Sequence, residues 1–231
     1  MQAVILAAGK GERMKPLTFH IPKPMIRVLG KNLIEHNLTQ LPPEVDELII
    51  VVGYLAEQVM NHFGEEFEGR KVTYVKQKKM LGTGHALFAC RPHIRGRFLV
   101  MMSDDMYSAR DIEACLSAGD NVMMVKKVHG KFSGGRIITD KEGNLLEIRE
   151  GVHNTKQALV NTALYVMTPD IFTYELEPIK DGKEYGLPQT MVKMIPEHPI
   201  KTVEAQDWYQ ISELSDLKSA ERLLRKRYKK G

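Results

Sequence analysis

Short apolar segments alternate with amphipathic segments along the first half of the chain, and this alternation most constrains its fold. Four apolar runs have the length of strands: 3–7, 47–52, 72–75 and 97–102. Four segments between or after them carry apolar residues at helical spacing: 34–41, 56–63, 84–90 and 111–116. Strands that alternate with helices in this way form βα units, and such units build a mainly parallel sheet.

The apolar runs contain Val, Ile, Leu and Met almost without interruption, as in the segment 47–52. Continuous runs of this kind are typical of strands that are covered by helices on both faces. We therefore predict an α/β fold, a Rossmann-like three-layer sandwich with a mainly parallel central sheet and right-handed crossovers. Ligands of such sheets bind at the carboxyl ends of the strands, so polar motifs directly after each run are the candidates for function.

The second half has a different texture from about Val122 onward. Closely spaced strand candidates follow one another at 121–128, 135–140, 144–150 and 158–167. Turns rich in Gly and Asn separate them, which predicts a small antiparallel lobe. The pattern then returns to a helix at 189–195, a strand at 200–205 and a closing helix from about Ser212. A chain of 231 residues with this order suits a single domain of two halves, about 1–120 and 121–231.

Composition excludes several classes of protein. Apolar residues make up 43% and charged residues 27%, as in ordinary globular domains. The two cysteines, Cys90 and Cys115, lack metal-site spacing and are predicted to be buried free thiols. The N-terminal apolar run is too short to span a bilayer and has no basic flank, which predicts a cytoplasmic protein with no membrane partner. The basic end at 222–230 is interpreted as a solvated helix end, so no nucleic-acid partner is expected.

A glycine-rich loop, AAGKGERM at 7–14, follows the first predicted strand directly. Its small residues let backbone N–H groups approach phosphate oxygens, and Arg13 and Lys15 add positive charge. The loop lacks the Gly-Lys-Ser/Thr end of a Walker A motif. Met14 stands where the dinucleotide-binding motif has its third glycine, which disfavours a nicotinamide-dependent dehydrogenase.

The loop continues through PLT and PKPM, and the complete segment 6–25, LAAGKGERMKPLTFHIPKPM, resembles the sugar-nucleotide pyrophosphorylases. These are the sugar-1-phosphate nucleotidyltransferases, with a glycosyltransferase-A-like fold, and the resemblance extends over nearly the whole chain. It implies that the loop wraps a nucleoside triphosphate. It assigns nucleotide contacts to Leu6, Ala8, Gly9 and Gly11. It also implies that Arg13 grips the phosphates and that Lys23 supports the phosphate under attack, so these two are the expected catalytic residues.

The segment 74–86, YVKQKKMLGTGHA, resembles the part of uridylyl- and thymidylyltransferases that faces the pyrimidine. The resemblance assigns base contacts to the Gln77 side chain and the Gly82 backbone, with Thr83 beside them. A primary amide has both a donor and an acceptor, which suits the N3–H and adjacent carbonyl of uracil or thymine. The structural alternative is that Gln77 caps a turn and that Thr83 is the N-cap of a helix.

An acidic pair ends the run 97–102, in the sequence SDDMY. The resemblance assigns Mg²⁺ binding to Asp104, with Asp105 as the alternative, and Mg²⁺ commonly takes few carboxylates together with substrate phosphates. The two acids could instead cap the helix at 111–116. The family's second ligand is usually an acid in a W-x-D segment, and here Gln210 takes that position. An amide brings no charge, and Asp207 could compensate.

The resemblance places the sugar in the second half. It assigns sugar contacts to Gly135 and Glu150, in GRIITDKEGNLLEIRE. Many relatives have a lysine after that glutamate to bind the sugar phosphate, but this chain has Gly151. Lys156, Arg149 or another cation could replace it, and the sequence leaves this choice open.

Two further segments resemble sugar-binding elements. In VNTALYVM, the resemblance assigns hydroxyl contacts to Asn161 and Thr162, with Ala163 where relatives have glycine. The alternative is that these polar groups are satisfied within a strand. In KEYGLPQT, Glu184 matches the family's pattern, and Gln189 replaces an acid.

The resemblance implies an Mg²⁺-dependent enzyme that transfers a nucleoside monophosphate from an NTP to a sugar 1-phosphate. UTP or dTTP and glucose 1-phosphate are the favoured substrates, and N-acetylglucosamine 1-phosphate comes next. The half at 1–120 would bind nucleotide, the half at 121–231 would bind sugar, and a homo-oligomer fits the family. Two alternatives stay open: a cytidylyltransferase for phosphocholine or a similar phosphate, and a nucleotide-sugar sensor without chemistry, suggested by Gln210, Gly151 and Gln189.

Overall fold

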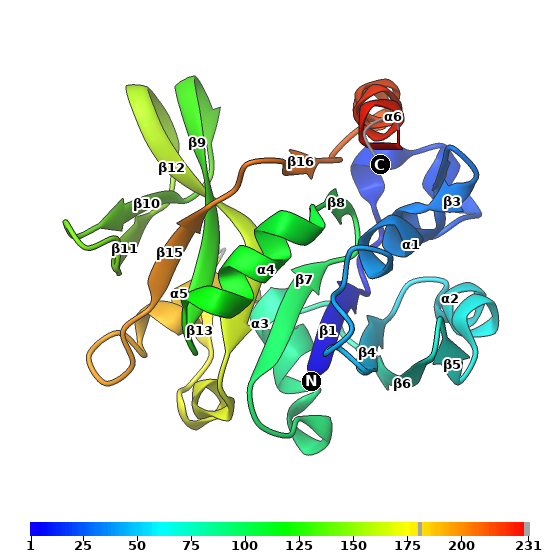
Figure 1. Cartoon of the computed structure of the whole chain (residues 1–231), viewed down its shortest axis with the longest axis horizontal. Helices are drawn as coiled ribbons and strands as arrows, with labels where there is room; N and C mark the ends of the chain where they lie inside the picture. Colours follow the sequence, from blue (N-terminus) through cyan, green and yellow to red (C-terminus); the bar gives the residue numbers. More distant parts are fainter. Residues whose placement is uncertain (180–181, 229–231) are drawn as a thin grey trace.

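The computed structural model describes residues 1–179 and 182–228. Its central sheet has a parallel core (Figure 1). Strand β1 (Gln2–Ala7) lies between β4 (Glu47–Val52) and β7 (Phe98–Met102), and β6 (Arg70–Lys76) pairs with β4. All three pairings are parallel, and the carboxyl ends of these strands therefore meet at one edge.

Helices cover both faces of the parallel core. On one face, apolar side chains of α1 (Leu33–Leu38), α2 (Ala56–Phe63) and α4 (Ala109–Ala118) pack against the odd-numbered residues of β1. On the other face, α3 (Gly82–Phe88) and α5 (Leu187–Val192) pack against its even-numbered residues. Burial on two sides explains the uninterrupted apolar runs. The predicted three-layer α/β fold is confirmed.

The antiparallel lobe lies beside β7. Its main feature is the long pair of β9 (Val122–Ser133) and β12 (Val152–Met167), and β12 also pairs antiparallel with β7. The lobe also contains β10 (Arg136–Thr139) and β11 (Leu145–Arg149), both antiparallel. One further strand, β15 (Lys201–Glu204), pairs parallel with β9. One ten-stranded sheet thus joins the lobe to the parallel core.

Several short strands have no counterpart in the predicted elements. They are β2 (Arg27–Val28), β3 (Lys31–Asn32), β5 (Glu66–Phe67), β8 (Asp105–Met106), β13 (Glu177–Ile179), β14 (Glu184–Gly186) and β16 (Tyr209–Gln210). The described residues also form the 3₁₀ helices η1 (Glu12–Met14), η2 (Leu17–Phe19), η3 (Lys23–Met25), η4 (Arg91–His93) and η5 (Pro169–Thr173). Segments of two to five residues are too short to show a periodic pattern.

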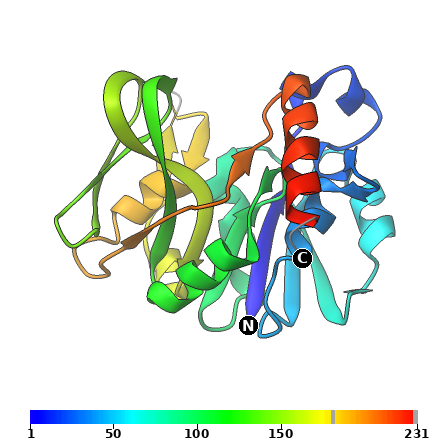
Figure 2. The same ribbon diagram turned by 45° about the horizontal axis from the view of Figure 1, so that its top comes forward.

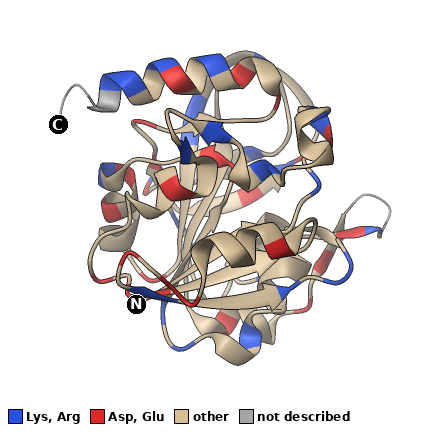
Figure 3. Ribbon diagram, turned by 90° about the vertical axis from the view of Figure 1, so that its right-hand side faces the viewer, with Lys and Arg blue, Asp and Glu red and all other residues tan. Residues whose placement is uncertain are grey.

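The closing helix α6 (Leu214–Tyr228) packs over the start of the chain, where Ala220 and Leu224 contact a small core that includes Met14. Its outer surface carries charges of both signs (Figure 3). Arg225 pairs with Glu221 one turn earlier, as expected for a solvated helix surface. Lys229 and Lys230 of the predicted basic end lie outside the described residues.

The two cysteines lie in the interior of the protein. Cys90 and Cys115 are both free and buried, and burial raises the pKa of each thiol to about 12. Neither thiol is therefore a nucleophile at neutral pH.

Across residues 1–179 and 182–228, no helix has the length and apolar character needed to cross a membrane.

Candidate active site

A continuous cleft follows the carboxyl edge of the parallel strands and extends into the antiparallel lobe. Four cavities of about 400, 340, 240 and 590 Å³ form it, in order from β6 to the lobe. Leu6 and Met102 line the first three, and Asn161 and Gln210 line the last two. The structure brings all the predicted site residues except Thr162 to the walls of this cleft.

The glycine loop takes its shape from Gly11, which has a φ of +62°. Its carbonyl oxygen accepts hydrogen bonds from the Met14 N–H at 2.9 Å and the Thr18 hydroxyl at 2.9 Å. A Cβ at Gly11 would lie 2.8 Å from the Cβ of Lys23. Glycine is required here because a side chain would clash with Lys23 and because other residues rarely adopt this φ.

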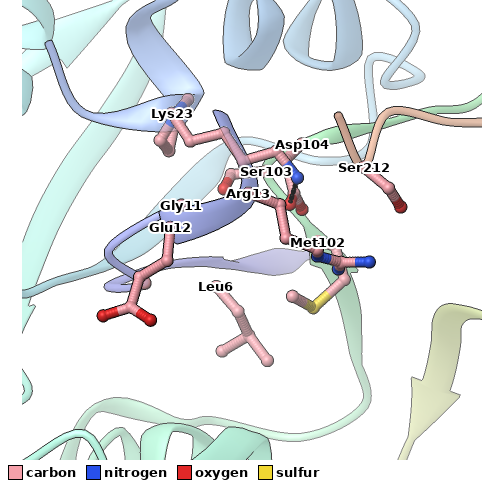
Figure 4. Close-up of a pocket in the computed structure, with 11 residues that line it drawn as sticks. Leu6, Gly11, Glu12, Arg13, Lys23, Met102, Ser103, Asp104 and Ser212 are labelled. Atoms are coloured by element: carbon pink, nitrogen blue, oxygen red, sulfur yellow. Dashed lines mark hydrogen bonds and ion pairs between the residues drawn. The ribbon is translucent and has the colours of Figure 1, made fainter. Parts of the chain in front are cut away.

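Lys23 and Asp104 meet in the 340 Å³ cavity (Figure 4). The Lys23 side chain is 10% exposed, and its Nζ lies 2.5 Å from Asp104 Oδ2. Arg13, an exposed residue of η1, lines the same cavity, and no carboxylate in the described part of the chain pairs with its guanidinium. The walls of the cavity therefore carry two cations, Arg13 and Lys23, and two carboxylates, Asp104 and Glu12.

The two neighbouring acids differ in their surroundings. Asp104 lines both the 340 and the 240 Å³ cavities. Asp105 lines only the 240 Å³ cavity, is only 5% exposed, and its Oδ2 accepts a hydrogen bond from Trp208 Nε1 at 3.2 Å. Burial, and then the charge of Asp104, raise the pKa of Asp105 well above its usual range. Asp104 is therefore the more accessible carboxylate. The alternative that this pair caps the following helix is wrong, because Ser108 is the N-cap of α4 and its hydroxyl accepts from Asp111 N.

Gln77 follows β6 and is 7% exposed. Its amide nitrogen lies 3.1 Å from the Gly82 carbonyl oxygen and 3.1 Å from His85 Nδ1. Both hydrogens of the amide therefore have acceptors within the protein, so the amide oxygen is the group left for a ligand in the 400 Å³ cavity. The Thr83 alternative is wrong: Leu81 is the N-cap of α3, and the Thr83 hydroxyl accepts from Leu187 N at 3.1 Å.

Gly82 lies at a close backbone contact between α3 and β14. It has a φ of +91°, and a Cβ there would lie 2.4 Å from the carbonyl oxygen of Tyr185. The Tyr185 N–H donates to the Leu81 carbonyl at 2.8 Å and fixes this contact. We expect Gly82→Ala to lower the free energy of unfolding by about 1–3 kcal/mol more than an alanine at an open glycine of similar φ, because its Cβ would clash with the Tyr185 backbone in addition to the strain at this φ. A Tm decrease measured by calorimetry would check this, and Gly96→Ala, at an open exposed turn with a φ of +70°, is the matched control.

The sugar-side residues come from the ends of strands β10 and β11, from β12 and from α5: Gly135 directly precedes β10 and Glu150 directly follows β11. A Cβ at Gly135 would lie 2.9 Å from Glu150 Oε1, so the carboxylate lies against this glycine. Gln189, which takes the place of the family's acid, donates its amide to Glu150 Oε1 at 2.8 Å. Two acids could not share this contact without a proton, so the amide suits the position.

Asn161 is held by two hydrogen bonds. Its amide donates to the Tyr165 hydroxyl at 2.6 Å, and its oxygen accepts from the Ala163 N–H at 2.9 Å. Ala163 has a φ of +56°, which explains why glycine occurs at this position in the resembling family. Thr162 does not reach the cleft: it is fully buried, and its hydroxyl donates to the Met124 carbonyl at 2.9 Å. The observed contact is the one expected of a polar residue satisfied within a strand.

The cations suggested as replacements for the missing lysine lie elsewhere. Arg149 pairs with Glu147, and Lys156 is exposed. Lys126 and Lys127 line the 590 Å³ cavity instead. Both lysines lie within β9 and not directly after a strand, so the rule that pointed to the glycine loop does not find them.

Known proteins resemble the chain over most of its length. The family model for nucleotidyl transferases matches residues 2–226. A UTP–glucose-1-phosphate uridylyltransferase, AglF, from Haloferax volcanii is 32% identical over 204 residues, 84% of each chain. The bifunctional protein GlmU of Methanococcus aeolicus is 31% identical over 223 residues, 95% of this chain and 53% of GlmU. The chain thus spans about half the length of GlmU relatives.

Solved structures support the same fold. A protein described as a glucose-1-phosphate thymidylyltransferase from Bacillus anthracis superposes with a TM-score of 0.84, at 22% identity, over 97% of this chain and 95% of its own. An inositol-1-phosphate CTP transferase from T. maritima gives 0.77 at 20% identity, with the same coverage. At these identities the two structures show the fold alone. The family match and the AglF similarity go further, and the chain belongs to the nucleotidyl transferase family.

Proposed function

We propose that the protein transfers a nucleoside monophosphate from UTP or dTTP to a hexose 1-phosphate, with glucose 1-phosphate favoured, and releases pyrophosphate. The observation that carries this proposal is the Lys23–Asp104 pair at the centre of one continuous cleft. Nucleotide-type groups lie on one side of it and sugar-type groups on the other. The similarity to AglF, whose name specifies UTP and glucose 1-phosphate, supports the choice of substrates.

The chemistry needs positioning and charge neutralisation. A phosphate oxygen of the sugar phosphate attacks the α-phosphorus in line, and the bond to pyrophosphate breaks. No general base is needed, because the attacking oxygen is already anionic at neutral pH. The backbone of the Gly11 loop and the Arg13 guanidinium hold the triphosphate, while the Lys23 ammonium supports the α-phosphate. The protein therefore acts mainly by holding two anions together.

The residues of the cleft fit a magnesium ion. Asp104 supplies a carboxylate and Gln210 an amide oxygen to the same 240 Å³ cavity. Within residues 1–179 and 182–228 no group of three His, Cys, Asp or Glu could hold an ion. In the proposed reaction the nucleotide phosphates would supply further oxygen ligands. Such a ligand set is typical of Mg²⁺, which supplies charge neutralisation at the phosphates when bound.

The base would contact the Gln77 amide oxygen and the N–H of Gly82. We expect Gln77→Glu to lower kcat/KM for UTP about 10-fold or more, because one carboxylate oxygen would replace the donor to Gly82 and repel its carbonyl. Steady-state rates of pyrophosphate release at varied UTP would measure this. Gln58→Glu, on the exposed part of α2, is the control. Equal rates for both variants would show that Gln77 does not read the base.

A substrate panel tests the whole proposal. Pyrophosphate release would be measured with Mg²⁺ for UTP, dTTP, CTP, GTP and ATP, each with glucose, N-acetylglucosamine and mannose 1-phosphates and phosphocholine. Activity with UTP or dTTP and a hexose 1-phosphate is the expected result. Activity restricted to CTP would favour the cytidylyltransferase alternative. No turnover with any pair, together with binding of a nucleotide sugar, would favour the sensor.

A further inference from the structure

The segment 205–212, here called the strap, crosses between the two parts of the molecule. It leaves β15 in the antiparallel lobe, includes β16 and leads into α6 above the parallel core (Figures 1 and 2). Gln210 and Ser212 of the strap line the 240 Å³ cavity with Asp104. The position of the strap therefore decides where these groups lie relative to the reacting phosphates.

One buried acid holds the beginning of the strap. Asp111, in the first turn of α4, is only 2% exposed. Its Oδ1 accepts from the Gln206 N–H at 2.9 Å and its Oδ2 from the Asp207 N–H at 2.8 Å. Hydrogen bonds from backbone N–H groups to a carboxylate are among the stronger hydrogen bonds in proteins, and two to one side chain also fix orientation.

Other contacts hold the same segment at neighbouring points. The Lys126 ammonium donates to the carbonyl oxygens of Ala205 at 2.9 Å and Gln206 at 3.3 Å. The Trp208 indole donates to the buried Asp105, and Gln210 pairs with Asp105 through the β8–β16 ladder. Asp111 thus accepts hydrogen bonds from two N–H groups of the strap, and Lys126 donates to two of its carbonyl oxygens. These contacts lie a few residues before Gln210 and Ser212, which line the cavity with Asp104.

We propose that Asp111 is a positioning residue that clamps the strap and thereby places Gln210 opposite Asp104. Asp111 does not line any of the four cavities of the cleft, so it acts through the strap and not by touching substrate. The catalytic consequence rests on the proposed function, whereas the clamp itself can be measured without substrate or metal.

Trp208 is the only tryptophan of the chain and lies on the strap, so its fluorescence reports the clamp directly. In Asp111→Ala, the N–H groups of Gln206 and Asp207 lose their acceptor, so the strap should loosen and expose Trp208 to water. We therefore expect a red shift of the Trp208 emission and more efficient quenching by acrylamide. Asp111→Asn retains one acceptor oxygen and should give an intermediate shift, which also covers the case that the alanine variant does not fold. Ser108→Ala is the matched control, because it removes the N-cap of α4 but no contact with the strap.

Kinetics then test the consequence for the cleft. With the active substrate pair, Asp111→Asn should lower kcat about 10- to 100-fold, as expected for a small displacement of positioning groups, while the KM for the NTP stays within about twofold. The proposal would be overturned if the Asp111 variants shifted the Trp208 emission and lowered kcat no more than Ser108→Ala does. Wild-type protein that is inactive with every pair would instead refute the proposed function, and the fluorescence of the variants would still decide whether Asp111 clamps the strap.

Discussion

A Lys23→Met variant is expected to lose about 10²- to 10³-fold in kcat, while its KM for UTP changes by no more than about threefold. The Lys23 ammonium lies on the cavity wall against Asp104, and the proposed reaction places the α-phosphate beside it. Charge accumulates on that phosphate mainly in the transition state, so a cation fixed there contributes more to turnover than to nucleotide binding. The loop backbone at Gly11 and the Arg13 guanidinium remain available to bind the triphosphate.

Two further variants separate the position of the Lys23 charge from the loss of charge alone. Lys31→Met removes the same charge at an exposed position in β3 and should leave kcat within about twofold, as surface changes away from a site usually do. Lys23→Arg keeps the charge but not the compact shape, and an intermediate kcat is expected. A Lys23→Met enzyme with unchanged kcat and a raised KM would show that Lys23 only binds nucleotide.

Much of this site follows from one rule applied to the sequence, that ligands bind where parallel strands end. The rule located the loop after β1, Gln77 after β6 and Asp104 after β7, and the structure places all three in one cleft. It works because the apolar runs are long enough to identify the strands, and parallel strands end at the same edge. The fold class followed from the same runs.

The sequence could not distinguish the roles of adjacent residues. Asp104 and Asp105 look equivalent in the sequence, but β8 turns one toward the cavity and buries the other beside Trp208. Thr162 and Asn161 are also neighbours, and opposite faces of β12 separate them, so only Asn161 reaches the cleft. The pairing of β8 with β16 separates the two acids, and strands of two residues give no periodic pattern to reveal it. In β12 the alternation of the two faces is readable from the sequence, but which face meets the cleft depends on its distant partners β7 and β9.

Long-range contacts were missed for a related reason. Asp111 appears in the sequence as an ordinary acid in the first turn of a helix, where its negative charge interacts favourably with the helix dipole. Its partners, the N–H groups of Gln206 and Asp207, lie 95 and 96 residues away. No local rule predicts that contact, although it fixes the segment that carries Gln210.

The proposed metal ligands, Asp104 and Gln210, give the second large effect. Asp104→Asn is expected to lower kcat about 10²- to 10³-fold at ordinary Mg²⁺ concentrations and to raise the Mg²⁺ concentration needed for half-maximal rate. The amide nearly preserves the shape of the side chain but brings no negative charge to the cavity. It also removes the charge partner of Lys23, so kcat should depend on the two residues non-additively.

Gln210→Asp is the opposite change in the same 240 Å³ cavity and restores the acid that the resembling family usually has there. We expect it to lower the Mg²⁺ concentration for half-maximal rate, because an added carboxylate strengthens the attraction for a divalent cation. Titrating MgCl₂ against pyrophosphate release in wild type and both variants measures the two shifts together. If Asp104 and Gln210 share one ion, the Mg²⁺ concentration for half-maximal rate must rise in Asp104→Asn and fall in Gln210→Asp. A Gln210→Asp enzyme with an unchanged requirement would mean that the amide lies outside the coordination sphere and that Asp104 and the nucleotide phosphates hold the ion without it.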